Sequence, residues 1–105
     1  MSFDEKVAER YERQRAAFAD IDDMTADMLR TYCTVCVQID ELNERIKDEG
    51  YIVRDERGKL RENIAVNTVH KLNADKARYF APLKRALSKQ ADEAAADDLD
   101  DFLGL

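Results

Sequence analysis

Apolar side chains recur at helical spacing in the first half of the chain, most regularly between residues 28 and 46. There they step by 4, 3, 4, 3 and 4 residues, which keeps them on one face of an α-helix for about three heptads. This pattern predicts a long helix that begins near Thr25 and ends at Gly50, because glycine readily adopts the positive φ common at helix C-termini. The apolar face consists of Met28, Tyr32, Val35, Ile39, Leu42 and Ile46.

A first helix is predicted ahead of it. Ser2, followed three residues later by Glu5, has the form of a capping box, and apolar residues at positions 3, 7, 11, 18 and 21 recur at helical spacing. The acidic stretch "DIDDMT" then interrupts the pattern. Its carboxylates suit the N-terminus of the second helix, where they cap free N–H groups and oppose the positive end of the dipole.

The segment "YIVRDERGKLR" changes the pattern from helical to extended. A short β-branched run, a polar turn containing Gly58 and a return strand around Leu60 predict a small β-hairpin near residues 51–62. A two-stranded hairpin is marginally stable in water. We therefore expect it to pack on the helices or to pair with a neighbouring chain.

A third helix is predicted after the hairpin, with Asn63 as its N-cap. Its apolar pattern is weaker than that of the second helix. Pro82 lacks the N–H of a helical hydrogen bond and clashes with the preceding turn, so it predicts a break or kink near Ala81. A short helix would then carry Leu83 and Leu87.

Composition agrees with one mainly α domain over residues 1–90. The chain has 105 residues, 38% of them charged, with three glycines and one proline. It contains no apolar run of about 18 residues, and its N-terminus lacks the apolar core of a signal peptide, which predicts a cytosolic protein with reduced thiols. Residues 91–105, "ADEAAADDLDDFLGL", are too acidic to fold alone and are expected to be disordered without a partner.

Charge is distributed unevenly along the chain. The net charge is −6, yet residues 54–89 hold ten Lys and Arg against four acids, a balance of 10 − 4 = +6. Such a segment is either a solvated face or a surface that binds phosphates and releases their counterions. The candidate DNA-binding residues are Arg54, Arg57, Lys59, Arg61, Lys71, Lys76, Arg78, Lys84 and Arg85.

Cys33 and Cys36 have the C-x-x-C spacing of redox dithiols and zinc sites. A zinc site usually needs four N or S ligands, and outside this pair the chain offers only His70. A thioredoxin-type dithiol begins at a helix N-terminus, whereas these cysteines lie inside the predicted second helix. We therefore predict two packing residues and no metal or cofactor, with a metal or disulfide shared between chains, or a redox role, as the alternatives.

No motif predicts catalysis. His70 is the sole histidine, and the sequence places no nucleophile or carboxylate beside it, nor an H-E-x-x-H or glycine-rich phosphate loop anywhere. We therefore do not expect an enzyme. The acidic C-terminal segment is predicted to dock on a partner protein or to fold back on the body, with apolar anchors at Leu99, Phe102, Leu103 and Leu105.

From about Thr25 to Leu87 the order of features resembles the small subunit of the terminase of tailed phages. The matching residues are Tyr32-Cys33 early in a long helix, Leu42 and Ile46 near its end, Glu49-Gly50 at its stop, Ile52-Val53 entering the hairpin, Gly58-Lys59 at its turn, Asn63 after it and Leu72 in the next helix. Several family members also end in an acidic tail with Phe or Leu.

The resemblance implies a ring of identical, non-catalytic subunits in the host cytoplasm that recognises viral double-stranded DNA and delivers it to the large subunit, which holds the ATPase and nuclease. In that interpretation the tail contacts the large subunit. Candidate interface residues are Met28, Tyr32, Val35, Cys36, Ile39, Leu42, Ile46, Ile52 and Val53. Two alternatives remain, a homo-oligomeric helical adaptor without nucleic-acid binding and an acidic DNA mimic.

Overall fold

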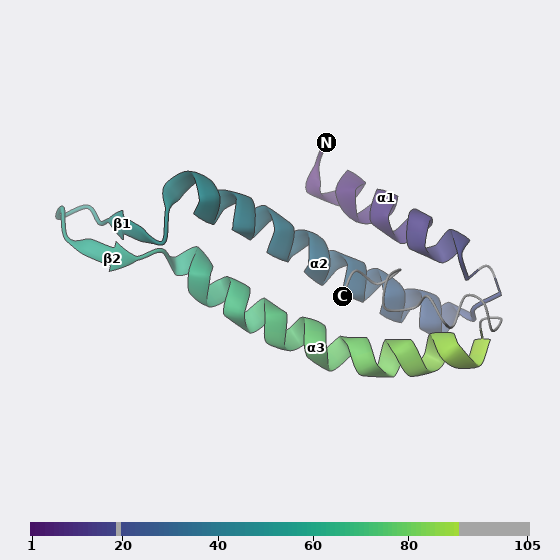
Figure 1. Cartoon of the computed structure of the whole chain (residues 1–105). Helices are drawn as coiled ribbons and strands as arrows, with labels where there is room; N and C mark the ends of the chain where they lie inside the picture. Colours follow the sequence, from purple (N-terminus) through teal and green to yellow (C-terminus); the bar gives the residue numbers. More distant parts are fainter. Residues whose placement is uncertain (19, 91–105) are drawn as a thin grey trace.

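The computed structural model describes residues 1–18 and 20–90 as three helices and one β-hairpin. Helices α2 and α3 lie side by side, connected at one end by the hairpin, and α1 packs along α2 near the other end (Figure 1). The predicted mainly α class with a small hairpin is confirmed. The elements are α1 Phe3–Ala16, α2 Asp23–Glu49, β1 Ile52–Arg54, β2 Leu60–Glu62 and α3 Ile64–Gln90.

The predicted capping residues set the helix boundaries. The Ser2 hydroxyl accepts a hydrogen bond from the Glu5 N–H at 3.1 Å, and the Asp22 carboxylate accepts one from the Thr25 N–H at 2.8 Å. At the other end of α2, Gly50 has φ 89° and donates its N–H to the carbonyl of Ile46 at 2.7 Å. Both ends of α2 therefore lie within two residues of their predicted positions.

Helix α1 is shorter than its apolar pattern indicates. It ends at Ala16, so Phe18 and Ile21 lie in the connection to α2, where both are nonetheless buried. The Phe18 N–H donates to the Arg15 carbonyl at 2.8 Å, which closes a turn at the helix end. The helical spacing thus identified buried residues correctly but extended the helix too far.

Pro82 does not break the third helix, so the predicted break near Ala81 and the separate short helix after it are wrong. Helix α3 runs from Ile64 to Gln90 with Pro82 inside it. Proline removes one helical hydrogen bond, but the next turns carry Leu83 and Leu87, both fully buried against the rest of the core. Burying two leucines stabilises the helix by several kcal/mol, on the order of 1.5–3 kcal/mol for each side chain, which offsets the lost bond.

The core is concentrated at the end of the molecule where α1 and α3 both pack on α2. Among residues 1–18 and 20–90, eleven buried residues form one cluster there, whereas the half nearer the hairpin holds a separate cluster of three. The large cluster contains Val7, Phe18, Ile21, Ala26, Leu29, Tyr32, Cys33, Cys36, Val37, Leu83 and Leu87, and the small one Ile46, Ala65 and Val69.

The hairpin is joined to the helices by Asn63. The strands are antiparallel, with Ile52 opposite Glu62 and Arg54 opposite Leu60. Asn63 is 2% exposed; its side chain donates to the Gly50 carbonyl at 3.0 Å and accepts from the Ala65 N–H at 3.1 Å. One side chain therefore caps α3, as predicted, and also ties the start of α3 to the end of α2.

Candidate nucleic-acid interface

The hairpin loop is organised by Asp55. One carboxylate oxygen accepts hydrogen bonds from the backbone N–H groups of Arg57 and Lys59, both at 2.9 Å, and the other accepts from Arg61 Nε at 2.6 Å. The bond from Arg61, followed by the backbone donors, lowers the pKa of Asp55. Gly58 closes the loop with φ 80° and a 2.9 Å bond from its N–H to the Asp55 carbonyl. The tip of the hairpin is therefore well defined at neutral pH.

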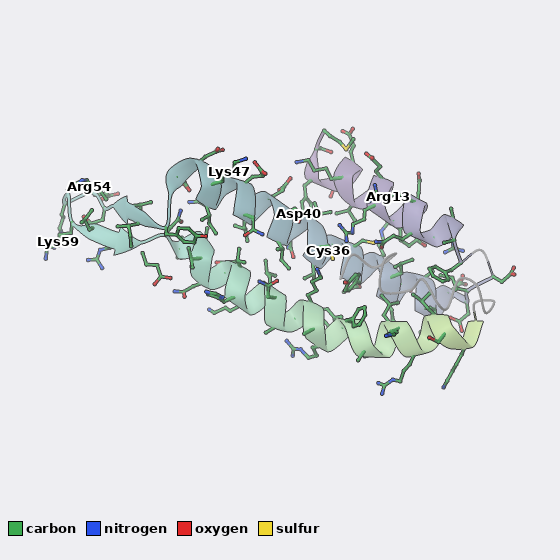
Figure 2. All side chains as sticks on the ribbon, viewed as in Figure 1. Arg13, Cys36, Asp40, Lys47, Arg54 and Lys59 are labelled. Atoms are coloured by element: carbon green, nitrogen blue, oxygen red, sulfur yellow. The ribbon has the colours of Figure 1, made fainter. Side chains whose placement is uncertain are left out.

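Two of the four basic hairpin residues are engaged within the hairpin itself. Arg61 pairs with Asp55, and Arg54 donates to the Gly58 carbonyl at 2.9 Å. Within residues 1–18 and 20–90 no hydrogen bond or ion pair engages the side chains of Arg57 and Lys59, which are exposed at the tip. Figure 2 shows Arg54 and Lys59 at this end, beyond both long helices. Arg57 and Lys59 are thus the hairpin cations most available to a ligand.

The basic residues of α3 divide into two groups. Lys71, Arg78, Arg85 and Lys89 follow one another at intervals of 7, 7 and 4 residues, which places them on one helix face. All four are exposed, and this face lies opposite the one that buries Val69, Leu83 and Leu87. At 1.5 Å per residue they extend over about 27 Å. We call Lys71, Arg78, Arg85 and Lys89 the basic stripe.

Lys76 and Lys84 lie outside the basic stripe. Their spacing turns them toward the packed side of α3, and both are half-buried. Lys84 Nζ lies 5.7 Å from the centre of the Phe80 ring, a cation–π distance. Within the stripe, Arg78 pairs with Asp75 and lies over the Tyr79 ring at 5.9 Å. Of the nine predicted DNA-binding residues, Lys76 and Lys84 are therefore the least suited to reach a phosphate.

The apolar face of α2 is largely covered by the chain's own helices. Tyr32, Val35, Cys36, Ile39 and Ile46 are all less than 8% exposed, while Met28, Leu42 and Val53 are half-buried. The five buried residues, predicted as subunit contacts, are therefore not on the surface of the folded chain. Only Ile52 of that predicted set is well exposed, at 57%.

The hairpin end carries four exposed apolar residues, and the sequence predicted only one of them, Ile52, as a surface contact. Tyr51, Leu60 and Ile64 are 69%, 65% and 71% exposed. We call the four exposed apolar residues of this end, Tyr51, Ile52, Leu60 and Ile64, the hairpin patch; the register places Ile52 and Leu60 diagonally across from each other on one face of the hairpin. One sequence signal could have predicted the exposure of Leu60, because this residue lies between Lys59 and Arg61 in a short strand.

Both cysteines are packing residues within the core. Cys33 is fully buried and its thiol donates to the Gln14 side-chain oxygen at 3.1 Å, while Cys36 is 3% exposed. Burial raises the pKa of Cys33 to about 11, so this thiol stays protonated at neutral pH. Among the described residues no three His, Cys, Asp or Glu side chains are grouped to hold a metal ion.

The remaining predicted positions add no further grouping. His70 is exposed on α3, and Leu99, Phe102, Leu103 and Leu105 lie outside the described residues. Over residues 1–18 and 20–90 no helix is long and apolar enough to cross a membrane. Comparison with protein-family models, curated proteins and solved structures finds no match.

Proposed function

We propose that this protein is a terminase small subunit, a non-catalytic oligomer in the host cytoplasm that recognises viral double-stranded DNA and delivers it to the large subunit. The observation that carries the proposal is the basic surface formed by the stripe on α3 together with Arg57 and Lys59 at the hairpin tip. These exposed cations lie in a chain whose net charge is −6. Four of them share one face of α3 and two lie at the hairpin tip, and this concentration of cations favours phosphate binding over general solubility.

The residues behind the family resemblance support the same proposal, because they build the hairpin. Gly50 and Gly58 have the two positive φ angles of the described chain, and Asn63 joins the hairpin to both long helices. Tyr32 and Cys33 are fully buried in the large cluster. Part of the resemblance therefore falls on positions whose residue type this fold constrains, whereas Ile52 and Lys59 are exposed.

Oligomerisation follows from the weakness of a single basic surface. One chain offers about six exposed cations to DNA, and each neutralised phosphate contributes modestly at physiological salt. Several copies held together would multiply these contacts through a high effective concentration. The hairpin patch, with Ile52 and Leu60 on one face, offers an apolar contact surface for a second copy.

Salt-dependent DNA binding tests the DNA contact. Charge reversal of Arg85 and Lys89 to Glu should weaken binding to double-stranded DNA of any sequence. It should also reduce the slope of log Kd against log salt by about 0.9 for each phosphate that the variant no longer neutralises. The matched control is the double variant Arg13→Glu, Lys47→Glu, which makes the same change in net charge at two exposed residues of α1 and α2, away from α3 (Figure 2). An unchanged slope in the double variant, or an equally weakened control, would remove the basic stripe as the DNA surface.

The alternative function is a homo-oligomeric helical adaptor without nucleic-acid binding, which the net charge of −6 favours. Light scattering coupled to size exclusion separates the cases, at 12.1 kDa per chain. A mass of about eight or more chains together with salt-dependent DNA binding supports the packaging subunit. The same mass without DNA binding supports the adaptor. A mass of one or two chains contradicts the ring and leaves a small helical adaptor as the better account.

A further inference from the structure

A shallow apolar groove lies between the start of α2 and the middle of α3, away from the hairpin. It has a volume of about 350 Å³ and is lined by Met24, Asp27, Met28, Thr31, Tyr79 and Pro82. Met24 is 75% exposed and Tyr79 is 39% exposed, so two large apolar side chains on opposite walls of the groove are open to solvent. The groove therefore presents an apolar surface that the described residues leave uncovered.

The charges around this groove are asymmetric. On the α3 side, Arg78, Arg85 and Lys89 lie on nearly the same helix face as Pro82, at intervals of 4, 3 and 4 residues. All three cations are exposed; Arg78 already pairs with Asp75 of the same helix, so Arg85 and Lys89 contribute most of the excess positive charge on this side. On the α2 side the lining residue Asp27 is acidic. An occupant of this groove should therefore combine apolar anchors with acidic residues that face α3.

The C-terminal segment of the chain has this chemistry. Residues 97–105, "DDLDDFLGL", alternate four aspartates with Leu99, Phe102, Leu103 and Leu105. The segment starts close to the groove, because Pro82 lies eight residues before Gln90, the last residue of α3, or about 12 Å along the helix. Leu99 is nine residues beyond Gln90, and nine extended residues span up to about 30 Å. The anchors can therefore reach the groove with length to spare.

We propose that the groove of Met24, Met28, Tyr79 and Pro82 binds the apolar end of the C-terminal segment of the same chain. Phe102 and Leu103 fill the groove, and the neighbouring aspartates face Arg78, Arg85 and Lys89. Attachment to α3 gives the segment an effective concentration in the millimolar range, so even a weak contact is populated. The anchors are then sheltered in the free chain, and a partner protein must displace them from the groove to bind them.

This inference concerns one chain alone and does not require the proposed DNA function. A failed DNA-binding test leaves the docking of the segment in the groove intact. In the docked state the aspartates face Arg78, Arg85 and Lys89, three of the four residues of the basic stripe, so DNA must displace the segment to reach them. The methionine signals and the salt slope are separate measurements, so the failure of either proposal is recognised on its own.

The methionines provide the test, because the chain has only three and two of them line the groove. The methyl signals of Met1, Met24 and Met28 are recorded by NMR in the full chain carrying ¹³C-methyl methionine. The double variant Phe102→Ser, Leu103→Ser should shift the Met24 and Met28 signals and leave Met1, which lies in a different groove beside α1, unchanged. The matched control Ala95→Ser, in the same segment, should shift none of them. Unchanged Met24 and Met28 signals in the double variant would overturn the proposal.

A spin label distinguishes the chain's own segment from that of a second copy. The label is attached through Gly104→Cys, and it reacts there selectively because Cys33 and Cys36 are buried. Broadening of the methyl signals of Met24 and Met28 by the spin label of the same chain supports the proposal. A sample that mixes spin-labelled chains with isotope-labelled wild-type chains should show no such broadening. Broadening in the mixture would assign the groove to a neighbouring copy and overturn the assignment to the same chain.

Discussion

The two ends of this molecule differ in how much apolar surface they bury. Where α1, α2 and α3 meet, eleven buried side chains form one cluster, and Leu29, Tyr32, Leu83 and Leu87 are inaccessible to solvent. At the hairpin end only Ile46, Ala65 and Val69 form a buried cluster. There the four residues of the hairpin patch are each more than half exposed.

This difference in burial implies that the two ends contribute unequally to the stability of the folded chain. Burial of apolar area is the main favourable contribution to folding, so the three-helix end should supply most of the stability of one chain. The hairpin end carries exposed apolar residues and the exposed cations Arg57 and Lys59. Within one chain the hairpin end is stabilised mainly by the hydrogen bonds of Asn63 and Asp55 and by the small cluster, so it should contribute less to stability than the three-helix end.

The sharpest test of this division compares two leucines of α3. Leu83 is fully buried in the large cluster, whereas Leu72 is half-buried in the hairpin half of the helix. Leu83→Ala should lower the free energy of unfolding by about 2–5 kcal/mol, through reduced burial and a residual cavity. Leu72→Ala, the matched change on the same helix, should cost less than half as much. Urea unfolding measures both, and equal losses would contradict the division.

The second test concerns the connection between the hairpin and the helices. Asn63→Ala removes the donor to the Gly50 carbonyl and the acceptor of the Ala65 N–H. Leaving such buried groups unsatisfied should cost about 1–3 kcal/mol. Hydrogen exchange should accelerate most in the hairpin and the first turns of α3, because opening there becomes easier. Asn67→Ala is the control, since Asn67 is exposed four residues further along α3, and it should have little effect.

A third test uses pH to examine the three-helix end. Burial raises the pKa of Cys33 from its ordinary value of 9.0 to about 11. As pH rises above 9, the unfolded chain releases this thiol proton while the folded chain keeps it. The unfolded state then binds fewer protons, so the free energy of unfolding should fall between pH 9 and pH 11 and be insensitive to this group below pH 9.

Urea unfolding at pH 7 to 11 measures that fall. Tyr32, whose pKa is also raised by burial, adds to it at the upper end of the range, so Cys33→Ala is the comparison that isolates the thiol. The variant should lose less stability between pH 9 and pH 10 than the wild-type chain. The Cβ resonance of Cys33 gives a direct check, and a native thiolate formed near pH 9 would show that the site admits water.

Local signals in the sequence were sufficient for most of the fold. Asp22, Gly50 and Asn63 mark helix ends through chemistry that acts over a few residues, and Gly58 marks the turn, so these boundaries were predictable. The apolar spacing of α2 likewise identified its buried face. It did not identify what covers that face, because periodicity is the same whether α3 or another copy packs on it.

The candidate site was harder to predict because it depends on the helix continuing through Pro82. The intervals of the basic stripe place Lys71, Arg78, Arg85 and Lys89 on one face only if α3 is unbroken. The expected break near Ala81 divided these residues between two elements. The helix continues through Pro82 because Leu83 and Leu87 are buried against the other helices. Local helix propensity carries no information about that burial.

A fourth test, with the smallest expected effect, asks whether a surface ion pair helps to attach α1 to α2. Lys6 Nζ lies 3.0 Å from Glu41 of α2, but both side chains are more than 40% exposed. A double-mutant cycle with Lys6→Ala and Glu41→Ala should give a coupling energy below about 1 kcal/mol, because water screens exposed charges and holding long side chains costs entropy. Val7→Ala, one residue along, should cost more, since Val7 is 5% exposed in the large cluster. If the ion pair proved stronger than the valine, α1 would be attached mainly by charge. High salt would then release it, and the stability of the three-helix end would depend on ionic strength.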